Sequence, residues 1–317
     1  MNRNLLGRRL LAGSAVLALA LTAACSSNGV SSSKEELTGE VKVDGSSTVF
    51  PLTSAASELY AEEQPKVKVP VGESGTGGGF EKFCNGETDI SDASRPIKDK
   101  EKQACEAKGI KYAELVVAND ALTVVVNKDN SFVDCLTVEQ LKKMWQPKST
   151  VKTWKDVDPK FPAEPIKLFG PGTDSGTFDY FTAEIVGEEG ASRTDYTPNE
   201  NDNVLVQGVA ADKSALGYFG FTYYEENTDK LKAVKIDSGE GCVEPSSENA
   251  QSGKYKPLAR PLFIYVSDKG VKREEVKSFV DFYIDNIDDI VKEAKFVPLT
   301  DEQKKTLQSE FDKLHQA

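Results

Sequence analysis

The sequence predicts an α/β protein of two lobes, and three observations support this prediction. The chain has 317 residues, about twice the length of a typical single domain, which favours two packed lobes. Strand and helix patterns alternate along most of the chain, which is typical of α/β folds with mostly parallel sheets. At three places a strand leads through a loop rich in Ser, Thr and Gly into a helix, so one structural unit recurs.

Composition and charge exclude several classes of protein. Hydrophobic residues make up 38% of the chain, as in ordinary folded proteins. The formal net charge of -12 disfavours binding to nucleic acid. The single histidine, His315, lies two residues before the last, so most Ser-His-Asp or Cys-His catalysis and any multi-histidine metal site are excluded. We expect no metal, no cofactor and no enzymatic activity.

The first 37 residues are predicted to export and anchor the protein. Residues 1–24 read as a signal peptide, with arginines followed by the apolar run 10–21. The small residues 22–24 stand directly before Cys25 and resemble a bacterial lipobox, in which the cysteine carries lipid; simple cleavage is the alternative. Residues 25–37 read as a Ser-rich tether. We expect the folded body to be held at the outer face of the cytoplasmic membrane.

Residues 41–86 are predicted to form two strands, each followed by a helix. Residues 41–43 alternate as a short strand, and Pro51 opens a helix. Residues 67–71 alternate as a second strand that runs into the glycine-rich loop 72–79. Phe80 begins another helix, which Gly86 ends. The helix after Pro51 has an apolar stripe at i, i+3, i+4, i+7 and i+8, formed by Leu52, Ala55, Ala56, Leu59 and Tyr60.

The middle of the chain continues the alternation. Residues 115–117 and 121–126 are predicted to form two apolar strands, and residues 137–145 a helix capped by Thr137. Residues 166–169 are predicted to form a strand, followed by the loop 170–177.

The remaining elements complete the pattern. A helix is expected over 178–185, a late strand over 262–266, and a helix with a clear apolar stripe over 276–284. Residues 300–303 read Thr-Asp-Glu-Gln, which is a capping box for the last helix.

Four cysteines remain after Cys25, an even number that suits disulfides in an oxidising compartment. Three pairings are open. We favour Cys84 with Cys105, which closes a short local loop, and Cys135 with Cys242, which stays within one expected lobe.

The recurring loops suit an oxyanion. A Ser/Thr/Gly loop entering a helix presents free N–H groups, hydroxyl donors and the positive end of the helix dipole. Glycines 77–79 would let consecutive N–H groups turn inward as a nest. Three such loops, with Ser94-Arg95-Pro96, favour a convergent anion pocket over simple helix capping.

The sequence lacks the motifs of nucleotide-binding proteins and of serine hydrolases. Residues 75–80 fail the dinucleotide fingerprint at its last position, and no Gly-Lys-Ser/Thr follows any glycine loop. No Gly-x-Ser-x-Gly elbow occurs, and Ser175 has no histidine to activate it.

Five segments together resemble the phosphate-binding proteins that serve the bacterial high-affinity phosphate ABC transporter. The segments are Asp44–Pro51, Glu73–Phe80, Asp89–Ile97, Gly170–Phe178 and Asp202–Val209. The resemblance implies a type II periplasmic-binding-protein clamshell of the Venus-flytrap kind, with two crossover strands near 122–127 and 259–265. Lobe one would comprise 38–123 plus 262–317, and lobe two 124–261.

The resemblance also implies the site residues. The expected phosphate contacts are Ser47, Thr48, Ser74, Gly75, Thr76, Ser94, Arg95, Ser175, Gly176 and Thr177. Family members often carry an arginine four residues before Ser-Gly-Thr, where this chain has Pro171, so Arg95 is expected to supply the cation. The family separates hydrogenphosphate from sulfate by a carboxylate that accepts the ligand's proton, and Asp92 and Asp174 are the candidates.

We therefore expect a monomeric lipoprotein that captures inorganic phosphate between its lobes and delivers it to a membrane-embedded ABC permease. Capture of another oxyanion, such as sulfate or molybdate, is the first alternative. A phosphate-ester hydrolase and an adhesion protein that uses its acidic surface are the others.

Overall fold

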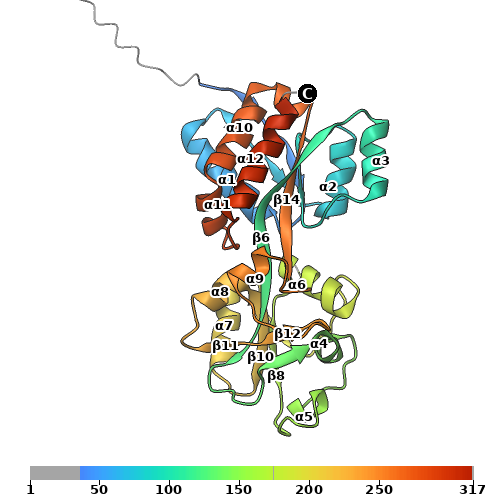
Figure 1. The fold of residues 1–317 in the computed structure, drawn as a ribbon, viewed down its shortest axis with the longest axis vertical. Helices are drawn as coiled ribbons and strands as arrows, with labels where there is room; N and C mark the ends of the chain where they lie inside the picture. The colour runs from blue at the N-terminus through green and yellow to red at the C-terminus, as the bar shows by residue number, and fades with distance from the viewer. Residues whose placement is uncertain (1–35, 174, 316–317) are drawn as a thin grey trace, which may run out of the picture. The chain divides into compact units, whose positions relative to one another are not determined.

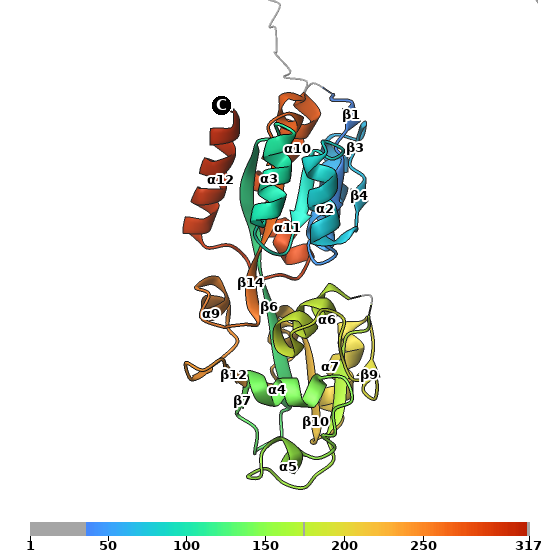
Figure 2. The ribbon, with the colours of Figure 1, turned by 90° about the vertical axis from the view of Figure 1, so that its right-hand side faces the viewer.

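The computed structural model describes residues 36–173 and 175–315. These residues form two α/β lobes, which confirms the predicted fold class. Two long strands, β6 (Tyr112–Asn127) and β14 (Ala259–Ser267), pair with each other and pass between the lobes (Figure 1, Figure 2). The predicted signal peptide, Cys25, most of the tether and Asp174 lie outside the described residues.

The central sheet of the first lobe has the strand order β4-β2-β5-β14-β6. The short strands are β2 (Val43–Gly45), β4 (Val71–Gly72) and β5 (Ile90–Ala93). Strand β2 runs parallel to β4 and β5, whereas β14 runs antiparallel to β5 and β6. The central sheet is therefore mixed and not mostly parallel as expected, because the chain leaves this lobe along β6 and returns along β14 in the opposite direction.

Helices cover both faces of this sheet. The hydrophobic core on one face joins it to α1 (Phe50–Glu63), α10 (Glu274–Asp285), α11 (Ile287–Glu293) and α12 (Asp301–His315). The core on the other face joins it to α2 (Gly75–Cys84) and α3 (Asp99–Ala107). Along β14, Ile264 belongs to the first core and Phe263 and Tyr265 to the second, which is the two-residue alternation of a strand buried on both faces.

The second lobe continues from the far end of β6. Its sheet adds β10 (Ala215–Gly220), β8 (Lys167–Gly170) and β9 (Thr197–Pro198), with β11 (Leu231–Ala233) paired to β6. One core contains α4 (Val138–Trp145), α6 (Gly176–Phe181) and the π-helical η1 (Thr182–Val186) that continues α6. Helix α7 (Asp202–Ala210) packs in the other, with α8 (Phe221–Glu225) beside it.

The remaining elements are short. They are β1 (Gly39–Glu40), β3 (Val67–Lys68), β7 (Cys135–Thr137), β12 (Lys235–Asp237), β13 (Cys242–Val243), α5 (Trp154–Val157), α9 (Ser247–Gln251) and the 3₁₀ turn η2 (Gly270–Lys272). Among the described residues, no helix combines the length and the apolar character needed to span a membrane.

Both expected helix caps are confirmed. At α4, the Thr137 hydroxyl accepts from the Gln140 backbone N–H at 3.0 Å, and the Gln140 side chain accepts from the Thr137 N–H at 2.9 Å. Thr300 and Gln303 make the same exchange at the start of α12, at 3.1 and 2.9 Å.

Three expected element boundaries are wrong. The strand expected over 67–71 is two short strands, β3 and β4, which belong to different sheets. The strands predicted over 115–117 and 121–126 are one strand, β6, because the polar residues between them pair with β14 in the crossover. Helix α2 begins at Gly75 and not at Phe80, so glycines 77–79 lie in the helix and not in a loop before it. A residue's helix propensity is a weak prior that tertiary packing overrides here.

Both favoured disulfides are confirmed. Cys84 bonds to Cys105, which ties α2 to α3, and Cys135 bonds to Cys242, which ties β7 to β13.

Candidate functional site

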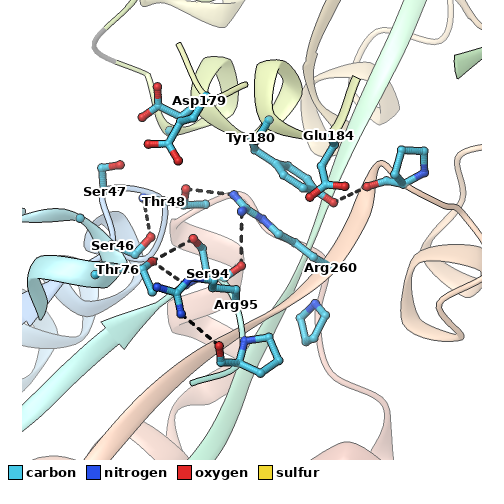
Figure 3. A pocket seen from close by; sticks show the side chains of 18 of the residues that line it. Ser46, Ser47, Thr48, Thr76, Ser94, Arg95, Asp179, Tyr180, Glu184 and Arg260 are labelled. Carbon is cyan, nitrogen blue, oxygen red and sulfur yellow. Dashed lines mark hydrogen bonds between the residues drawn. The ribbon is translucent and has the colours of Figure 1, made fainter. Parts of the chain in front are cut away.

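A cavity of about 780 Å³ lies between the lobes, where three loops meet the crossover strand β14 (Figure 3). The first lobe lines it with Ser46, Ser47, Thr48, Ser74, Gly75, Thr76, Gly77, Ser94, Arg95, Pro96 and Lys98. The second lobe lines it with Gly176, Asp179, Tyr180, Ala183, Glu184, Glu189, Lys256 and Pro257, and β14 with Ala259, Arg260 and Pro261.

The first loop, Ser46–Thr48, joins β2 to α1 and is held tightly against β5. The Ser46 N–H donates to the Asp92 carbonyl at 2.9 Å, and the Ser46 hydroxyl accepts from the Thr48 N–H at 3.2 Å. Gly45 makes this turn possible, because a Cβ at that position would lie 2.1 Å from the Asp92 carbonyl oxygen. The predicted contacts Ser47 and Thr48 therefore line the cavity at the start of α1.

The second loop starts α2, and its hydroxyls differ in what they can offer. The Ser74 hydroxyl donates to Asp44, which also accepts from Lys82 at 2.5 Å. Burial acts to raise the pKa of Asp44, but the hydrogen bonds from Lys82 and Ser74 outweigh it and hold that pKa below its ordinary value. The hydroxyl hydrogen of Ser74 is thus already used in the bond to Asp44. Gly75 and Thr76 are the residues of this segment best placed to face a ligand.

The third loop follows β5 and meets the second. Thr76 Oγ1 accepts from the Ser94 N–H at 3.2 Å and lies 3.1 Å from Ser94 Oγ. Thr76 and Ser94, which are distant in the sequence, therefore form one polar surface, as the sequence predicted.

Arg95 lines the cavity, but its guanidinium is bound elsewhere. Nη2 and Nη1 donate to the two carboxylate oxygens of Glu101 at 2.8 and 2.9 Å, and the group lies 5.7 Å from the Phe80 ring centroid. A bidentate pair of this kind satisfies most of the guanidinium's charge. Arg95, which was expected to supply the cation, is therefore paired with Glu101.

Arg260 on β14 also lines the cavity, and sequence reasoning did not select it. Its Nη2 donates to Thr48 Oγ1 at 3.1 Å, its Nη1 donates to the Ser94 carbonyl at 3.3 Å, and its guanidinium carbon lies 3.5 Å from the Tyr180 ring centroid (Figure 3). It thus touches two of the predicted loops and the second lobe. The signal in the sequence was a lone arginine at the start of an apolar crossover strand.

Asp120 holds Arg260 in place. The two residues face each other in the β6–β14 ladder, and Arg260 Nε donates to Asp120 Oδ2 at 3.2 Å. Asp120 is 4% exposed, so burial raises the pKa of its carboxyl, while the charge and hydrogen bond of Arg260 oppose the rise. A buried carboxylate that anchors a guanidinium also fixes the direction in which its free N–H groups point.

Asp92, a candidate proton acceptor, does not line the cavity. It is fully buried beneath the first loop, and its Oδ1 accepts from the Thr53 hydroxyl on α1 at 2.9 Å. Burial and the neighbouring Asp44 raise the pKa of Asp92 to about 8, against the hydrogen bond from Thr53. The sequence could not reveal this, because the direction of a strand side chain depends on register. Asp174, the other candidate, lies outside the described residues.

The second lobe contributes the start of α6. Gly176 lines the cavity, whereas Ser175 and Thr177 do not. The Ser175 hydroxyl caps the helix by accepting from the Thr177 N–H at 3.2 Å, and Thr177 lines a smaller neighbouring cavity of about 140 Å³. Gly176 packs closely on the first lobe, because a Cβ there would lie 2.6 Å from Thr48 Oγ1.

Three acids on the second lobe also line the cavity, and no sequence motif singles them out. They are Asp179 on α6, Glu184 on η1 and Glu189 after it. Desolvation and the nearby Glu189 raise the pKa of Asp179, and the charge of Arg260 opposes this.

The chain was compared with known protein families, sequences and structures. Residues 30–286 match the model of the PBP superfamily domain. The chain is 44% identical to "Phosphate-binding protein PstS" of Staphylococcus saprophyticus, covering 96% of this chain and 94% of that protein. It is 51% identical to "Protein SphX" of Synechococcus elongatus, covering 82% and 77%. A crystal structure from Planctomyces limnophilus, described as "a possible phosphate binding protein", superposes with a TM-score of 0.84 at 48% identity, covering 88% of this chain and 99% of that one.

Proposed function

Because this chain belongs to the PBP superfamily, and within it to the phosphate-binding proteins of the PstS type, we propose that it captures inorganic phosphate in the cavity between its lobes. The family consists of binding proteins of transport systems and not of enzymes.

One observation carries the proposal: the loops that start α1 and α2, the loop after β5 and the start of α6 converge around Arg260. The first three supply backbone N–H groups and the hydroxyls of Ser47, Thr48, Thr76 and Ser94. Neutral oriented donors with one guanidinium suit a small tetrahedral anion, since each phosphate oxygen can accept several hydrogen bonds.

The electrostatics explain how a protein of net charge -12 can hold an anion. Helix starts contribute partial positive charge without a compensating side chain. Arg260 is already neutralised in part by Asp120, so it offers directed donors more than free charge. A ligand buried when the lobes close would keep all its hydrogen bonds.

The wider role is proposed from the sequence and from family membership. We infer that residues 1–24 are removed on export and that lipid on Cys25 anchors the protein at the outer face of the cytoplasmic membrane. The protein would act as a monomer that delivers phosphate to an ABC permease. The Ser-rich segment that follows Cys25 supports this, because such a tether lets an anchored body reach a membrane partner.

Calorimetric titration of the purified protein, stripped of bound ligand by unfolding and refolding, tests the proposal. We expect one-to-one binding of phosphate and no heat with sulfate. Binding of sulfate or molybdate in place of phosphate would indicate another oxyanion receptor. Absence of heat and of any melting-temperature shift with all three anions would refute oxyanion capture altogether.

A further inference from the structure

A second set of contacts joins the two lobes on the side of the crossover strands opposite to the cavity. It centres on Lys295, in the segment that links α11 to α12 of the first lobe, and on α8 of the second lobe. In Figure 1, α11 and α8 lie to the left of β6, whereas α6, whose start lines the cavity, lies to its right. These contacts therefore lie behind the strands that connect the lobes.

Lys295 contacts the second lobe through both its side chain and its backbone. Its ammonium group donates to the two carboxylate oxygens of Glu226 at 2.8 and 2.9 Å and lies 4.8 Å from the Tyr223 ring centroid. The Thr222 hydroxyl donates to the Lys295 carbonyl at 2.9 Å. We call the contacts of Lys295 with Glu226, Tyr223 and Thr222 the rear clamp.

The backbone at Lys295 would favour glycine. Lys295 directly follows the C-cap of α11 and has a φ of +58°. Its N–H donates to the Lys292 carbonyl at 3.2 Å, and the Phe296 N–H donates to the Val291 carbonyl at 3.0 Å. This is the Schellman motif, in which the left-handed residue is usually glycine, because a side chain there is strained. The turn therefore gives no reason for a lysine, whereas the side-chain contacts with α8 do.

The segment that carries Lys295 is also fixed to a crossover strand next to the cavity. Val297 and Asn119 of β6 exchange backbone hydrogen bonds that are both 3.0 Å long. Asn119 directly precedes Asp120, whose carboxylate accepts from Arg260 at 3.2 Å. A small separate hydrophobic core joins α8, α9, β6 and this segment, and its buried members are Ala121, Phe221, Ala250 and Val297.

The rear clamp is formed in the same structure in which the lobes meet at the cavity. Gly176 of the second lobe packs against Thr48 of the first lobe, while the ion pair of Lys295 with Glu226 is intact. The clamp is therefore compatible with the arrangement that surrounds a ligand. The apparent affinity of a protein for its ligand scales with the fraction of molecules in the binding-competent arrangement, so contacts that favour this arrangement raise affinity.

We propose that the rear clamp holds the lobes near the arrangement that binds the ligand, so that Lys295 and Glu226 set phosphate affinity without touching phosphate. This inference rests on the proposed function. Neither residue lines the cavity proposed for phosphate. They are positioning residues, because they act through β6 and through the relative placement of the two lobes.

The test is calorimetric titration of the full chain and its variants with phosphate. Lys295→Gly removes the clamp and relieves the left-handed backbone, so its melting temperature should stay close to that of the wild type. Its phosphate binding should be about threefold to tenfold weaker. Glu226→Gln should cause a similar loss, and the double variant should lose little more, because both changes break one pair. Lys295→Arg, which keeps the charge, should bind like the wild type.

Lys148 and Glu225 supply matched controls. Among the described residues, Lys148 is the other non-glycine residue with a positive φ, at +59°, and it is exposed. Glu225 directly precedes Glu226 and has no ion pair within the described part of the chain. Lys148→Gly and Glu225→Gln should bind phosphate as tightly as the wild type. A loss at either control equal to that of Lys295→Gly would overturn the inference.

Small-angle scattering without ligand gives a readout that does not depend on phosphate. Ligand-free Lys295→Gly should be less compact than the ligand-free wild type. A wild type that binds no phosphate would refute the proposed function, and the scattering comparison would still decide whether the clamp holds the lobes. A wild type that binds phosphate, with Lys295→Gly and Glu226→Gln variants that bind it as tightly or more tightly, would overturn only the inference.

Discussion

At the residue scale, the cavity depends on which charged groups are already satisfied. Arg95 and Arg260 both line it, yet Glu101 binds both terminal nitrogens of Arg95, whereas Asp120 binds only Nε of Arg260. The two terminal nitrogens of Arg260 contact Thr48 and Ser94, which line the cavity themselves. Arg260 is therefore the guanidinium that can turn its donors to a ligand.

Replacing Arg260 should weaken phosphate binding by about 1.5 to 3 kcal/mol, the usual worth of a charge-assisted hydrogen bond. Arg260→Lys keeps the charge and prevents a lone buried Asp120, so it is the variant to titrate beside Arg260→Ala. The same titration of Arg95→Ala should show a smaller loss. Equal losses at both arginines would mean that the pairing of Arg95 with Glu101 does not keep Arg95 from the ligand.

Asp92 should make the protein less stable as the pH rises. The pKa of its carboxyl rises from 3.8 to about 8 on folding, so the folded state binds this proton more tightly than the unfolded chain between those values. The free energy of unfolding therefore falls as the pH rises through this range, by at most about 1.4 kcal/mol per pH unit. Urea unfolding of the wild type and of Asp92→Asn between pH 5 and 8 measures the effect, since the difference between the two isolates this group.

The advantage of the wild type over Asp92→Asn should be largest at the acid end and shrink or reverse at the alkaline end. A difference that does not change with pH would mean that Asp92 is ionised throughout.

At the element scale, the start of α2 shows why the glycine-rich segment is needed. The segment was expected to be a loop that cradles an anion, but it forms the first turns of a helix. At Gly79 a Cβ would lie 2.5 Å from the Gly45 Cα and 3.0 Å from the Asp44 carbonyl oxygen, so glycine here lets α2 pack directly on the end of β2. At Gly77 the nearest atom to a Cβ is Arg95 Nη2 at 4.0 Å.

Gly79 and Gly77 lie in the same helix, so substitutions at the two positions can be compared directly. Gly79→Ala should destabilise the protein by about 1 to 3 kcal/mol, because backbone on both sides must move. Gly77→Ala should be neutral or stabilise by up to about 1 kcal/mol, since alanine favours the helix and meets no obstacle. Denaturant unfolding of both variants measures the difference, and equal values would show that α2 is not packed as described.

At the scale of the two lobes, Gly176 limits how closely the start of α6 approaches the first loop. A Cβ there would lie 2.6 Å from Thr48 Oγ1 and 3.0 Å from the Thr48 backbone nitrogen. The contact joins two lobes that have separate hydrophobic cores. A side chain at this position would therefore act on the distance between the lobes more than on either core.

Gly176→Ala should weaken phosphate binding about tenfold or more and leave the melting temperature of the ligand-free protein nearly unchanged. Small-angle scattering with phosphate should show a less compact form than the wild type. Gly220→Ala is the control, because a Cβ there meets nothing nearer than 3.6 Å. A full compaction of Gly176→Ala by phosphate would contradict this role.

Much of the protein followed from local signals in the sequence. The alternation of elements, the caps at Thr137 and Thr300, and both disulfide pairings could be predicted because each rests on neighbouring residues or on a small set of choices. The serine, threonine and glycine residues of the loops could be recognised as oxyanion donors for the same reason: the chemistry resides in the residue types and their spacing.

Only the tertiary structure decided which charged residues reach the cavity. Arg260 and Asp120 come together because the two crossover strands pair. Arg95 forms an ion pair with Glu101. The register of β5 directs the Asp92 side chain beneath the first loop, where it bonds to Thr53. Asp179 faces the cavity because α6 is docked across from the first lobe. Side-chain direction and long-range pairing depend on register and packing between distant segments, and no local pattern in the sequence encodes them.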